Sequence, residues 1–540
     1  MAIKIPESKD SSESAEERLE SMGGWRVYIK APVALISGSA ATVPSQARKY
    51  PRATIATAFL LAKMGDAIGA RKRLNLLQPN GDGRMHRDNS IAADLILVDT
   101  HVKVYEDRAL TEADSMRLTQ LLSTLPADDL LGQALTFNHL STAALHRGEF
   151  DRAQDHAENA IRFYSLGGAQ FGSLHMYTHL GQIRMMRGDL AGAKMQYEEM
   201  EGCLAEVSGD PQGLRAICRA LKSEVAYEMN ELNTAQSLLD EAVSIIEDTD
   251  AWLDVFAATY RVRARLAFAN AGLPGALTEL AHADAAARDR NMPRLGRLMC
   301  IERIRAFTLS GEINTAFKEM VSIGLDPNRL DAKQPDNDWG LRHGTTNVTI
   351  ARWLVRAQRP KRAMDFVDLA EETAIRGGQL LTLAKLRVIR AQAYWRLNAR
   401  PEAIGALLSA IRLLGNQPFR RFILDEGADL QPIVQAALDR DFISTPISAA
   451  QRRRLSEFTH SWSASSLEEG GKLAADYRTA VQKRYLELLA QGHSNKEISR
   501  VMGVSVNTVK YHLKHIFRDM HVDSRARAVS LAREIGMIDL

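Results

Sequence analysis

The sequence has few cysteines and no long hydrophobic run, and each shortage excludes a class of protein. Its three cysteines, Cys203, Cys218 and Cys300, are too few and too far apart in 540 residues for a disulfide framework. No apolar stretch approaches the roughly 18 residues that a membrane-spanning helix requires. The first residues are polar and acidic, which is unlike a signal peptide. We therefore expect a cytoplasmic protein that does not enter a membrane.

Residue patterns that support catalysis or cofactor binding are also lacking. The sequence has no Gly-x-x-x-x-Gly-Lys-Ser/Thr loop, and Gly470-Gly471-Lys472 lacks the spacing and the hydroxyl of a phosphate-binding loop. His175 and His179 are four residues apart on a predicted helix, but no third ligand accompanies them. We therefore expect no enzyme, no cofactor and no metal.

Charge is unevenly distributed along the chain. Residues 472–540 contain 12 Lys and Arg against 7 Asp and Glu, a net charge of +5. The whole chain carries +3, so residues 1–471 carry about −2. A positive excess confined to one segment is what nucleic-acid binding requires, so the C-terminal segment is the candidate for it.

A repeat of about 41 residues begins near Tyr50 and defines the architecture. In each clear copy a Gly or Asn precedes an Ala by five positions, and weaker copies keep only the Ala (Ala113, Ala276 and Ala363). The clear pairs are Gly65/Ala70, Gly148/Ala153, Gly188/Ala193, Asn230/Ala235, Gly311/Ala316 and Asn398/Ala403. Apolar residues with helical spacing precede the turn and follow the Ala. Each unit is therefore predicted to be a helical hairpin, and stacked hairpins form a superhelical solenoid.

The last stretch, residues 479–540, is predicted to form four short helices. Thr479 to Gln482 and Ser494 to Glu497 are two capping boxes that open the first two helices. Ser505 caps a third helix at about residues 506–519, and Ser524 caps a fourth at about 525–535. Two short helices joined by a tight turn with a glycine indicate a helix-turn-helix.

The third of these helices has two contrasting faces. Its apolar stripe, which must face a core, consists of Val509, Leu513, Ile516, Phe517 and Met520. Its opposite stripe is basic and contains no acid; it consists of Asn507, Lys510, Tyr511, Lys514 and Arg518. Such a face suits the major groove of DNA. From composition alone, a solvated basic face on an ordinary bundle is an equal alternative.

The sequence of this region closely resembles the DNA-binding domain of LuxR/FixJ-type regulators. The matching motifs are Ser494-Asn-Lys-Glu-Ile498, Val504-Ser-Val-Asn-Thr-Val-Lys510, His512-Leu-Lys-His-Ile516 and Ser524-Arg525. The resemblance implies that Lys510, Tyr511 and Lys514 face the major groove, and that Thr508 and the helix starts hold the DNA backbone. The full set of candidate DNA-binding residues is Ser494, Asn495, Lys496, Ser505, Asn507, Thr508, Lys510, Tyr511, Lys514 and Arg518. The resemblance also implies dimerisation through the fourth helix, with Val529, Ala532 and Ile535 as candidates.

A second resemblance covers about residues 50–440. The segment from Tyr50 to Ala70, and the block from Pro418 to Gly427 that contains Asp425 and Glu426, are similar to the repeat region of the large ATP-binding, maltose activator-like LuxR-type regulators. Their nucleotide-binding domain has no counterpart in this sequence, so ATP-driven switching is not expected.

These observations predict an all-α protein: a superhelical solenoid of TPR-like hairpins followed by a four-helix LuxR-type domain. The expected divisions are a disordered or unassigned segment at 1–45, a solenoid that senses or interacts at 46–440, a linker at 441–478 and the DNA-binding domain at 479–540. The predicted function is a transcriptional regulator that binds promoter DNA as a homodimer. Its solenoid would sense a small-molecule or protein effector, and RNA polymerase is a further candidate partner. The alternative is a TPR-type adaptor with an accessory DNA-binding domain. The sequence names neither the operator, nor the effector, nor the sign of regulation.

Overall fold

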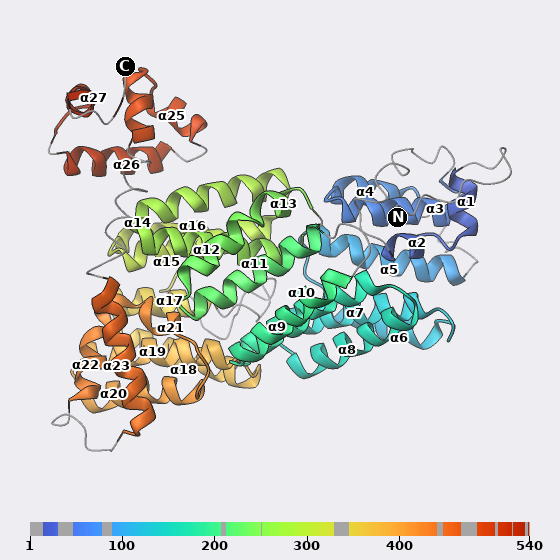
Figure 1. Ribbon diagram of the computed structural model, residues 1–540, viewed down its shortest axis with the longest axis horizontal. Coiled ribbons are helices and arrows are strands. Elements are labelled where there is room, and N and C mark those ends of the chain that lie inside the picture. The colour runs from blue at the N-terminus through green and yellow to red at the C-terminus, as the bar shows by residue number, and fades with distance from the viewer. Residues whose placement is uncertain are drawn as a thin grey trace.

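The computed structural model describes residues 15–30, 47–77, 89–206, 212–249, 251–328, 345–439, 447–465, 483–502, 506–520, 522–534 and 538. Helices make up the secondary structure of these residues, and no strand occurs among them. Figure 1 shows stacked helices over most of the chain, with α25, α26 and α27 grouped near the C-terminus. The prediction of an all-α solenoid followed by a small helical domain is therefore confirmed.

Helical hairpins follow one another along the first part of the chain. Each hairpin packs against the next, as the predicted solenoid requires. The first hairpins are α3 (Pro51–Lys63) with α4 (Ala67–Asn75), α5 (Asn89–Tyr105) with α6 (Glu112–Thr124), α7 (Leu130–Arg147) with α8 (Phe150–Leu166), and α9 (Gln170–Met186) with α10 (Leu190–Glu206).

The stacking continues to the end of the solenoid. The next helices are α11 (Gln212–Glu228), α12 (Leu232–Asp240), α13 (Val243–Glu247), α14 (Leu253–Asp289), α15 (Pro293–Leu309) and α16 (Ile313–Ser322). The last are α17 (Thr345–Arg356), α18 (Pro360–Arg376), α19 (Leu380–Arg396), α20 (Arg400–Leu413), α21 (Arg421–Leu424) and α22 (Gln431–Leu438). Helix α14 is itself a hairpin, because its backbone breaks at Gly272, where φ is 64°.

The Gly and Asn residues of the repeat lie where the chain must adopt a left-handed backbone. All six predicted turn residues have positive φ, including 72° at Gly148, 68° at Asn230 and 59° at Asn398. Glycine adopts this conformation without strain, and asparagine tolerates it better than most residues. The repeat signal therefore arises from the geometry of the turn between the two helices of each hairpin.

The repeated alanines lie where the two helices of a hairpin come closest. Eight of the nine are at most 1% exposed, from Ala70 to Ala403. Ala113 is the exception, because it is exposed and Ser115 takes the buried position of α6. In α6 the small buried residue of the repeat is therefore Ser115, two positions after the predicted Ala113.

The N-terminal segment is partly folded, which corrects the expectation of disorder for its described part. Residues 15–30 form α1 (Ala15–Ser21) and α2 (Arg26–Ile29), and Trp25 is fully buried against the first hairpins. Trp25 Nε1 donates to Asp94 Oδ1 at 2.8 Å, and Arg26 forms an ion pair with Asp94 at 2.7 Å. Apolar residues of this acidic segment pack against α3, and its two polar bonds reach Asp94 of α5. The buried apolar residues are Leu19, Trp25, Tyr28 and Ile29.

The expected linker at 441–478 also contains a helix, α23 (Ala449–Ser465). Leu455 and Phe458 are fully buried, and α23 packs against α20, α21 and α22. Arg454, which lies in the expected linker, donates to the carbonyl oxygens of Gln417 and Phe419 at 2.9 and 3.0 Å. The apolar positions of α23 therefore extend the solenoid into the segment that was expected to be a linker.

The described part of the chain contains no helix with the length and apolar character needed to cross a lipid bilayer.

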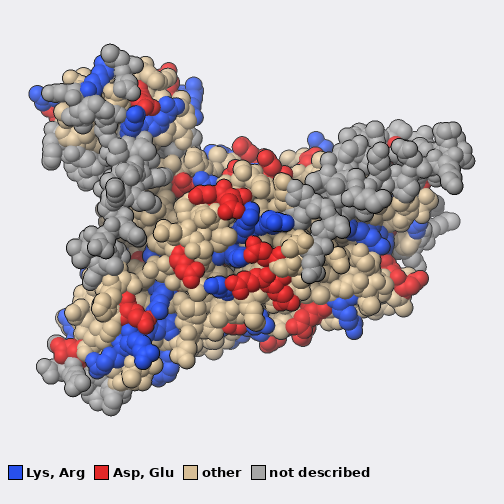
Figure 2. Space-filling model, viewed as in Figure 1, with Lys and Arg blue, Asp and Glu red and all other residues tan. Residues whose placement is uncertain are grey.

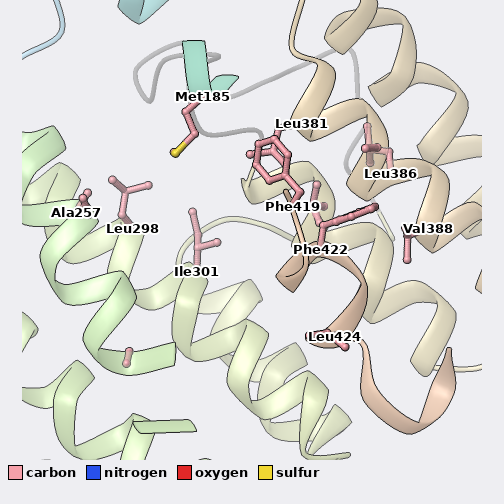
Figure 3. Packing of buried hydrophobic residues seen from close by; sticks show 14 of the residues in the cluster. Met185, Ala257, Leu298, Ile301, Leu381, Leu386, Val388, Phe419, Phe422 and Leu424 are labelled. Atoms are coloured by element: carbon pink, nitrogen blue, oxygen red, sulfur yellow. The ribbon is translucent and has the colours of Figure 1, made fainter. Parts of the chain in front are cut away.

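The superhelix closes on itself, because helices far apart in the sequence meet at its centre. Helix α9 packs against α19, and α11 packs against α21. A Cβ atom on Gly188 would lie only 3.0 Å from Leu414, so glycine permits this close approach. Figure 3 shows buried side chains of one cluster that come from α9, α15, α19 and the segment near Phe419 and Phe422.

The block from Pro418 to Gly427 supplies two buried carboxylates at this centre, Asp425 and Glu426. Asp425 forms ion pairs with Arg305 and Arg421, each at 2.6 Å, and accepts a hydrogen bond from the Tyr227 hydroxyl at 2.9 Å. Glu426 pairs with Arg352 at 2.7 Å. Burial would raise the pKa of Asp425, but the nearby guanidinium groups hold that pKa well below its usual range. The block therefore ties α11, α15 and α17 together.

Replacing Asp425 with asparagine is expected to destabilise the solenoid by about 3–5 kcal/mol, because it leaves buried arginines without their charge partner. Urea denaturation followed by circular dichroism measures the change. The difference in unfolding free energy between the variant and the unchanged protein should be largest at neutral pH. It should shrink as pH falls below about 4, because the carboxyl group is ionised above its unfolded pKa and protonates in acid.

The matched control is Asp151→Asn, since Asp151 pairs with Arg187 but its side chain is 94% exposed. It is expected to change stability by at most about 1 kcal/mol. An equal effect of both substitutions would show that Asp425 does not hold the closure.

Candidate nucleic-acid interface

Helix α25 (Asn495–Val501) begins with the predicted capping box. The Ser494 backbone NH donates to Glu497 Oε2 at 2.7 Å, and the Glu497 backbone NH donates to Ser494 Oγ at 3.3 Å. These hydrogen bonds lower the pKa of Glu497. Ser494 thus caps the helix, and the capping box engages the backbone amides of both Ser494 and Glu497.

Helix α26 (Val506–Asp519) divides into the two predicted faces. Val509, Leu513 and Ile516 are 0%, 5% and 2% exposed, and Phe517 and Met520 pack against the same cluster. Lys510 and Lys514 are exposed, four residues apart on the same helix. Residues four apart lie one above the other on a helix surface, so the two ammonium groups share the outer face.

His512 lies on the buried side of α26 and holds it against the first helix of the domain, residues 483–490. Its ring stacks on that of Tyr485, with centroids 4.7 Å apart and an interplanar angle of 26°. Tyr485 is fully buried, and His512 is 3% exposed. Packing against Tyr485 therefore accounts for this histidine.

Arg525 is a positioning residue whose role the sequence reasoning missed. It opens α27 (Arg525–Glu534) and donates to the backbone carbonyl of His493 and to Asn495 Oδ1, the latter at 3.2 Å. Arg525 therefore fixes α27 against the start of α25. Asn495, a predicted DNA contact, is engaged within the domain by this bond. The only sequence signal for this role was that Ser524-Arg525 belongs to the motifs that carry the family resemblance.

Other predicted residues are placed only in part. Lys496 is exposed on α25. Asn507, Thr508, Tyr511 and Arg518 lie on α26, but the description covers only their backbone. Ser505, Thr479 and Ile535 lie outside the described residues. Their roles remain predictions.

One predicted dimer residue faces inward. Ala532 is 0% exposed and belongs to the core of the domain, together with Ala528. A fully buried methyl group cannot contact a partner, so we remove Ala532 from the proposed dimer face. Val529 is half-buried and packs against the same core, which leaves part of its side chain accessible.

The surface of the domain is rich in positive charge. Figure 2 shows several patches of Lys and Arg on the small domain formed by α25, α26 and α27. Exposed cations are contributed by Lys483, Arg484, Lys496, Arg500, Lys510, Lys514, Arg527 and Arg533. Cations on one small domain attract a polyanion at long range.

Comparisons with known protein families match both parts of the chain. Residues 104–440 match the family model described as the MalT-like TPR region. Residues 479–532 match the model described as bacterial regulatory proteins, luxR family. The two matches correspond to the solenoid and to the C-terminal domain.

Individual relatives are similar over different lengths. The HTH-type transcriptional regulator AlkS of Pseudomonas putida is 25% identical over 325 residues, which cover 59% of this chain and 35% of AlkS. The regulator MalT of Serratia proteamaculans is 19% identical over 73% of this chain and 48% of MalT. The transcriptional activator protein PhzR of Pseudomonas fluorescens is 34% identical over 100 residues, 17% of this chain and 41% of PhzR. The matched part thus spans about a third of AlkS and half of MalT.

Replacing a side chain by alanine should affect the stability of the domain differently on the two faces of α26. His512→Ala removes a buried ring, so we expect it to destabilise the domain by about 1–3 kcal/mol and to speed amide hydrogen exchange in α26 of the full-length protein. Lys514→Ala removes an exposed side chain and should leave exchange unchanged, since alanine favours helices. Faster exchange in Lys514→Ala than in His512→Ala would contradict the assignment of the faces.

Proposed function

Because the chain belongs to the family with a MalT-like TPR region and ends in a LuxR-type helix-turn-helix, we propose that it is a DNA-binding transcriptional regulator. The observation that carries this proposal is the geometry of α26. Its apolar stripe is buried in the domain, and Lys510 and Lys514 extend from the opposite, exposed face. We propose that α26 is the helix that enters the major groove.

The division of tasks follows from the chemistry of each position. Lysine ammonium groups donate to guanine O6 or N7 and discriminate bases where they reach them. At the start of α25 the exposed Lys496 is suited to a phosphate group of the DNA backbone, and Ser494 holds the helix start by its capping box. Arg525 fixes α27 against the start of α25, so a backbone contact made by α25 keeps a fixed relation to the surface of α27.

We propose that the domain binds DNA as a homodimer through α27. A single recognition helix contacts few base pairs, and a two-fold dimer doubles the sequence that is read. The accessible part of Val529 and the neighbouring exposed residues Ser530 and Arg533 are the candidate contact surface, in place of the buried Ala532. Ile535 remains a candidate from the sequence.

The solenoid is proposed to be the sensor. Its closed superhelix buries an extensive charged network, and any occupant of its inner surface contacts several hairpins at once. An effector can change DNA binding only if it binds one arrangement of the protein more tightly than another. The alternative is an adaptor, in which the repeats hold a protein partner such as RNA polymerase and the DNA-binding domain is always free.

Lys510→Ala and Lys514→Ala are each expected to weaken specific DNA binding by about 1–3 kcal/mol, because each removes a donor to a base edge. Binding should be measured on promoter fragments found by genome-wide mapping of the DNA bound in cells. Lys72→Ala, which removes an exposed lysine of α4, is the matched control and should not change affinity.

Unchanged operator affinity in both variants, with unchanged circular dichroism, would refute the groove assignment. Uniform weakening on all sequences, with a salt dependence smaller by about one ion, would instead place the lysine on a phosphate.

The proposal that the solenoid is a sensor is tested by comparing the affinities of the full-length protein and of residues 472–540 for the same operator. If the solenoid is a switch, the full-length protein should bind more weakly until a cell-extract fraction with the effector is added. Equal affinities and equal regulatory output under all growth conditions would favour the adaptor. The isolated segment must first show the helical spectrum of a folded domain.

A further inference from the structure

A cavity lies in the N-terminal half of the solenoid, away from the charged centre. The first helices of successive hairpins, α3, α5, α7 and α9, pack side by side and line it. Trp252, at the start of α14, completes the wall. The cavity leaves about 60 Å³ for the centres of water-sized groups, whereas one water needs only about 10–15 Å³. It therefore has room for a guest larger than a single water.

The wall of this cavity offers little to an ionic guest. None of the described residues that line it is Asp or Glu. Lys63 lines it, but this side chain is engaged within the protein, and its ammonium group lies 5.9 Å from the centroid of the Phe59 ring. A charged guest would lose its hydration without gaining a charge that is free to pair with it, so the cavity favours a neutral guest.

His139 presents a buried hydrogen-bond acceptor. Burial lowers the pKa of His139 to about 3, so its ring is neutral near pH 7 and carries a single proton. The ring donates to the backbone carbonyl of Leu97, and its Nε2 is buried without a hydrogen-bond partner among the described residues. The proton is therefore on Nδ1, and Nε2 is a lone pair. The side chain is only 2% exposed, so a guest that donates to Nε2 satisfies an atom that the described part of the protein leaves unsatisfied.

His175 and His179 of α9 line the same cavity and hold their proton in the same place. His175 Nδ1 lies 2.9 Å from the carbonyl oxygen of Phe171, which can only accept. Ser141 Oγ donates to the carbonyl oxygen of Ala153, so it accepts from His179 Nδ1 at 2.9 Å. Both rings are thus protonated on Nδ1, and in their neutral form Nε2 is an acceptor. The histidines of the wall therefore favour a guest that donates a hydrogen bond.

His101 can adapt to such a guest. Its Nε2 is buried without a hydrogen-bond partner, and no bond among the described residues fixes which nitrogen carries the proton. Burial, with the charges of His139, Lys63 and His175, holds the pKa of His101 well below its usual value, so this ring is also neutral. Its centroid lies 5.5 Å from that of His139. A hydroxyl group, which both donates and accepts, can therefore donate to His139 and accept from His101.

Flat rings form much of the remaining wall. Phe59 and His101 stack with centroids 4.4 Å apart and an interplanar angle of 20°. The ring centroid of Tyr105 lies 4.9 Å from that of His101, and the centroid of Trp252 lies 5.9 Å from that of His175. Aromatic walls favour a planar guest, which can stack on these rings or meet their edges.

We propose that this cavity binds a small neutral phenol. The phenol hydroxyl donates to Nε2 of His139 and accepts from Nε2 of His101, and the ring lies among Phe59, Tyr105 and Trp252. A carboxylate fits poorly, because its oxygens would face the lone pair of His139. The consequence for regulation rests on the proposed sensor function, to which the site gives a chemical class of effector. The binding itself does not depend on DNA.

Calorimetric titration of the full-length protein with phenol tests the site directly. Phenol should bind with one site per chain. Three probes of similar size each lack one feature: fluorobenzene has no donor, benzoate is an anion, and cyclohexanol is not flat. Each should bind about fivefold more weakly or worse, because it leaves the buried acceptor or the flat walls without a partner. No binding of phenol at millimolar concentration, or equal or tighter binding of any of the three, would overturn the proposal.

Two variants locate the binding in this cavity. His139→Phe and His101→Phe each keep a flat ring but remove Nε2. Each should weaken phenol binding by about fivefold or more, and His139→Phe should leave the weak binding of fluorobenzene unchanged, since fluorobenzene makes no bond to Nε2. His156→Phe in α8, which does not line the cavity, is the matched control and should bind phenol normally. Equal phenol binding by all three variants would show that the site lies elsewhere.

Hydrogen exchange of the unchanged full-length protein gives the location without any substitution. Saturating phenol should slow amide exchange in α5 and α7, the helices of His101 and His139, because a bound ligand stabilises the closed form of the helices that it contacts. Protection confined to other helices would overturn the proposal, even if a variant fails to fold. Operator affinity is measured separately. Phenol binding without any change in operator affinity would support the site and refute its role as the sensor.

Discussion

The buried carboxylates of Asp425 and Glu426 are the constraint on which the superhelix depends. Each lies among arginines from helices distant in sequence, Arg305 of α15 for Asp425 and Arg352 of α17 for Glu426. A buried charge is tolerated only when it is paired, so these carboxylates fit the structure only when the solenoid is closed. Non-directional burial of alanine and leucine would stabilise many curvatures. The ion pairs select one of them.

The sequence predicted the repeated helical hairpins, but it predicted few of the contacts that close the superhelix. The turn residues and the small alanine are local requirements, so Gly148 with Ala153 could be read from spacing alone. The partners of Asp425 lie 120 residues away at Arg305 and 198 residues away at Tyr227, and no local pattern encodes such distances. The family resemblance identified the block from Pro418 to Gly427, but it gave no reason for its charges.

The expected disorder at the N-terminus and the expected linker at 441–478 were wrong in their described parts for one reason, which is that average composition does not reveal a few apolar anchors. Trp25 and Phe458 are fully buried in segments whose average character is acidic or serine- and arginine-rich. In the C-terminal domain the two faces of α26 were predictable, because the spacing of residues in a helix is enough to assign Val509 to the apolar face and Lys510 to the basic face. The inward position of Ala532 and the bond of Arg525 to the start of α25 were not, because they depend on how α27 crosses the other helices.

The solenoid has one cavity at its charged centre and another among α3, α5, α7 and α9, and the two share structural elements. Helix α9 lines the N-terminal cavity with His175 and His179, and it lines the central cavity one turn later with Gln182 and Met185. Trp252 borders the first cavity, and Asp254, two residues on, borders the second. Close-packed elements transmit a displacement instead of absorbing it. A ligand that moves α9 or the start of α14 therefore acts on the helices that meet the block of Asp425, and that block is continuous with α22 and α23, the last described elements of the solenoid before the DNA-binding domain.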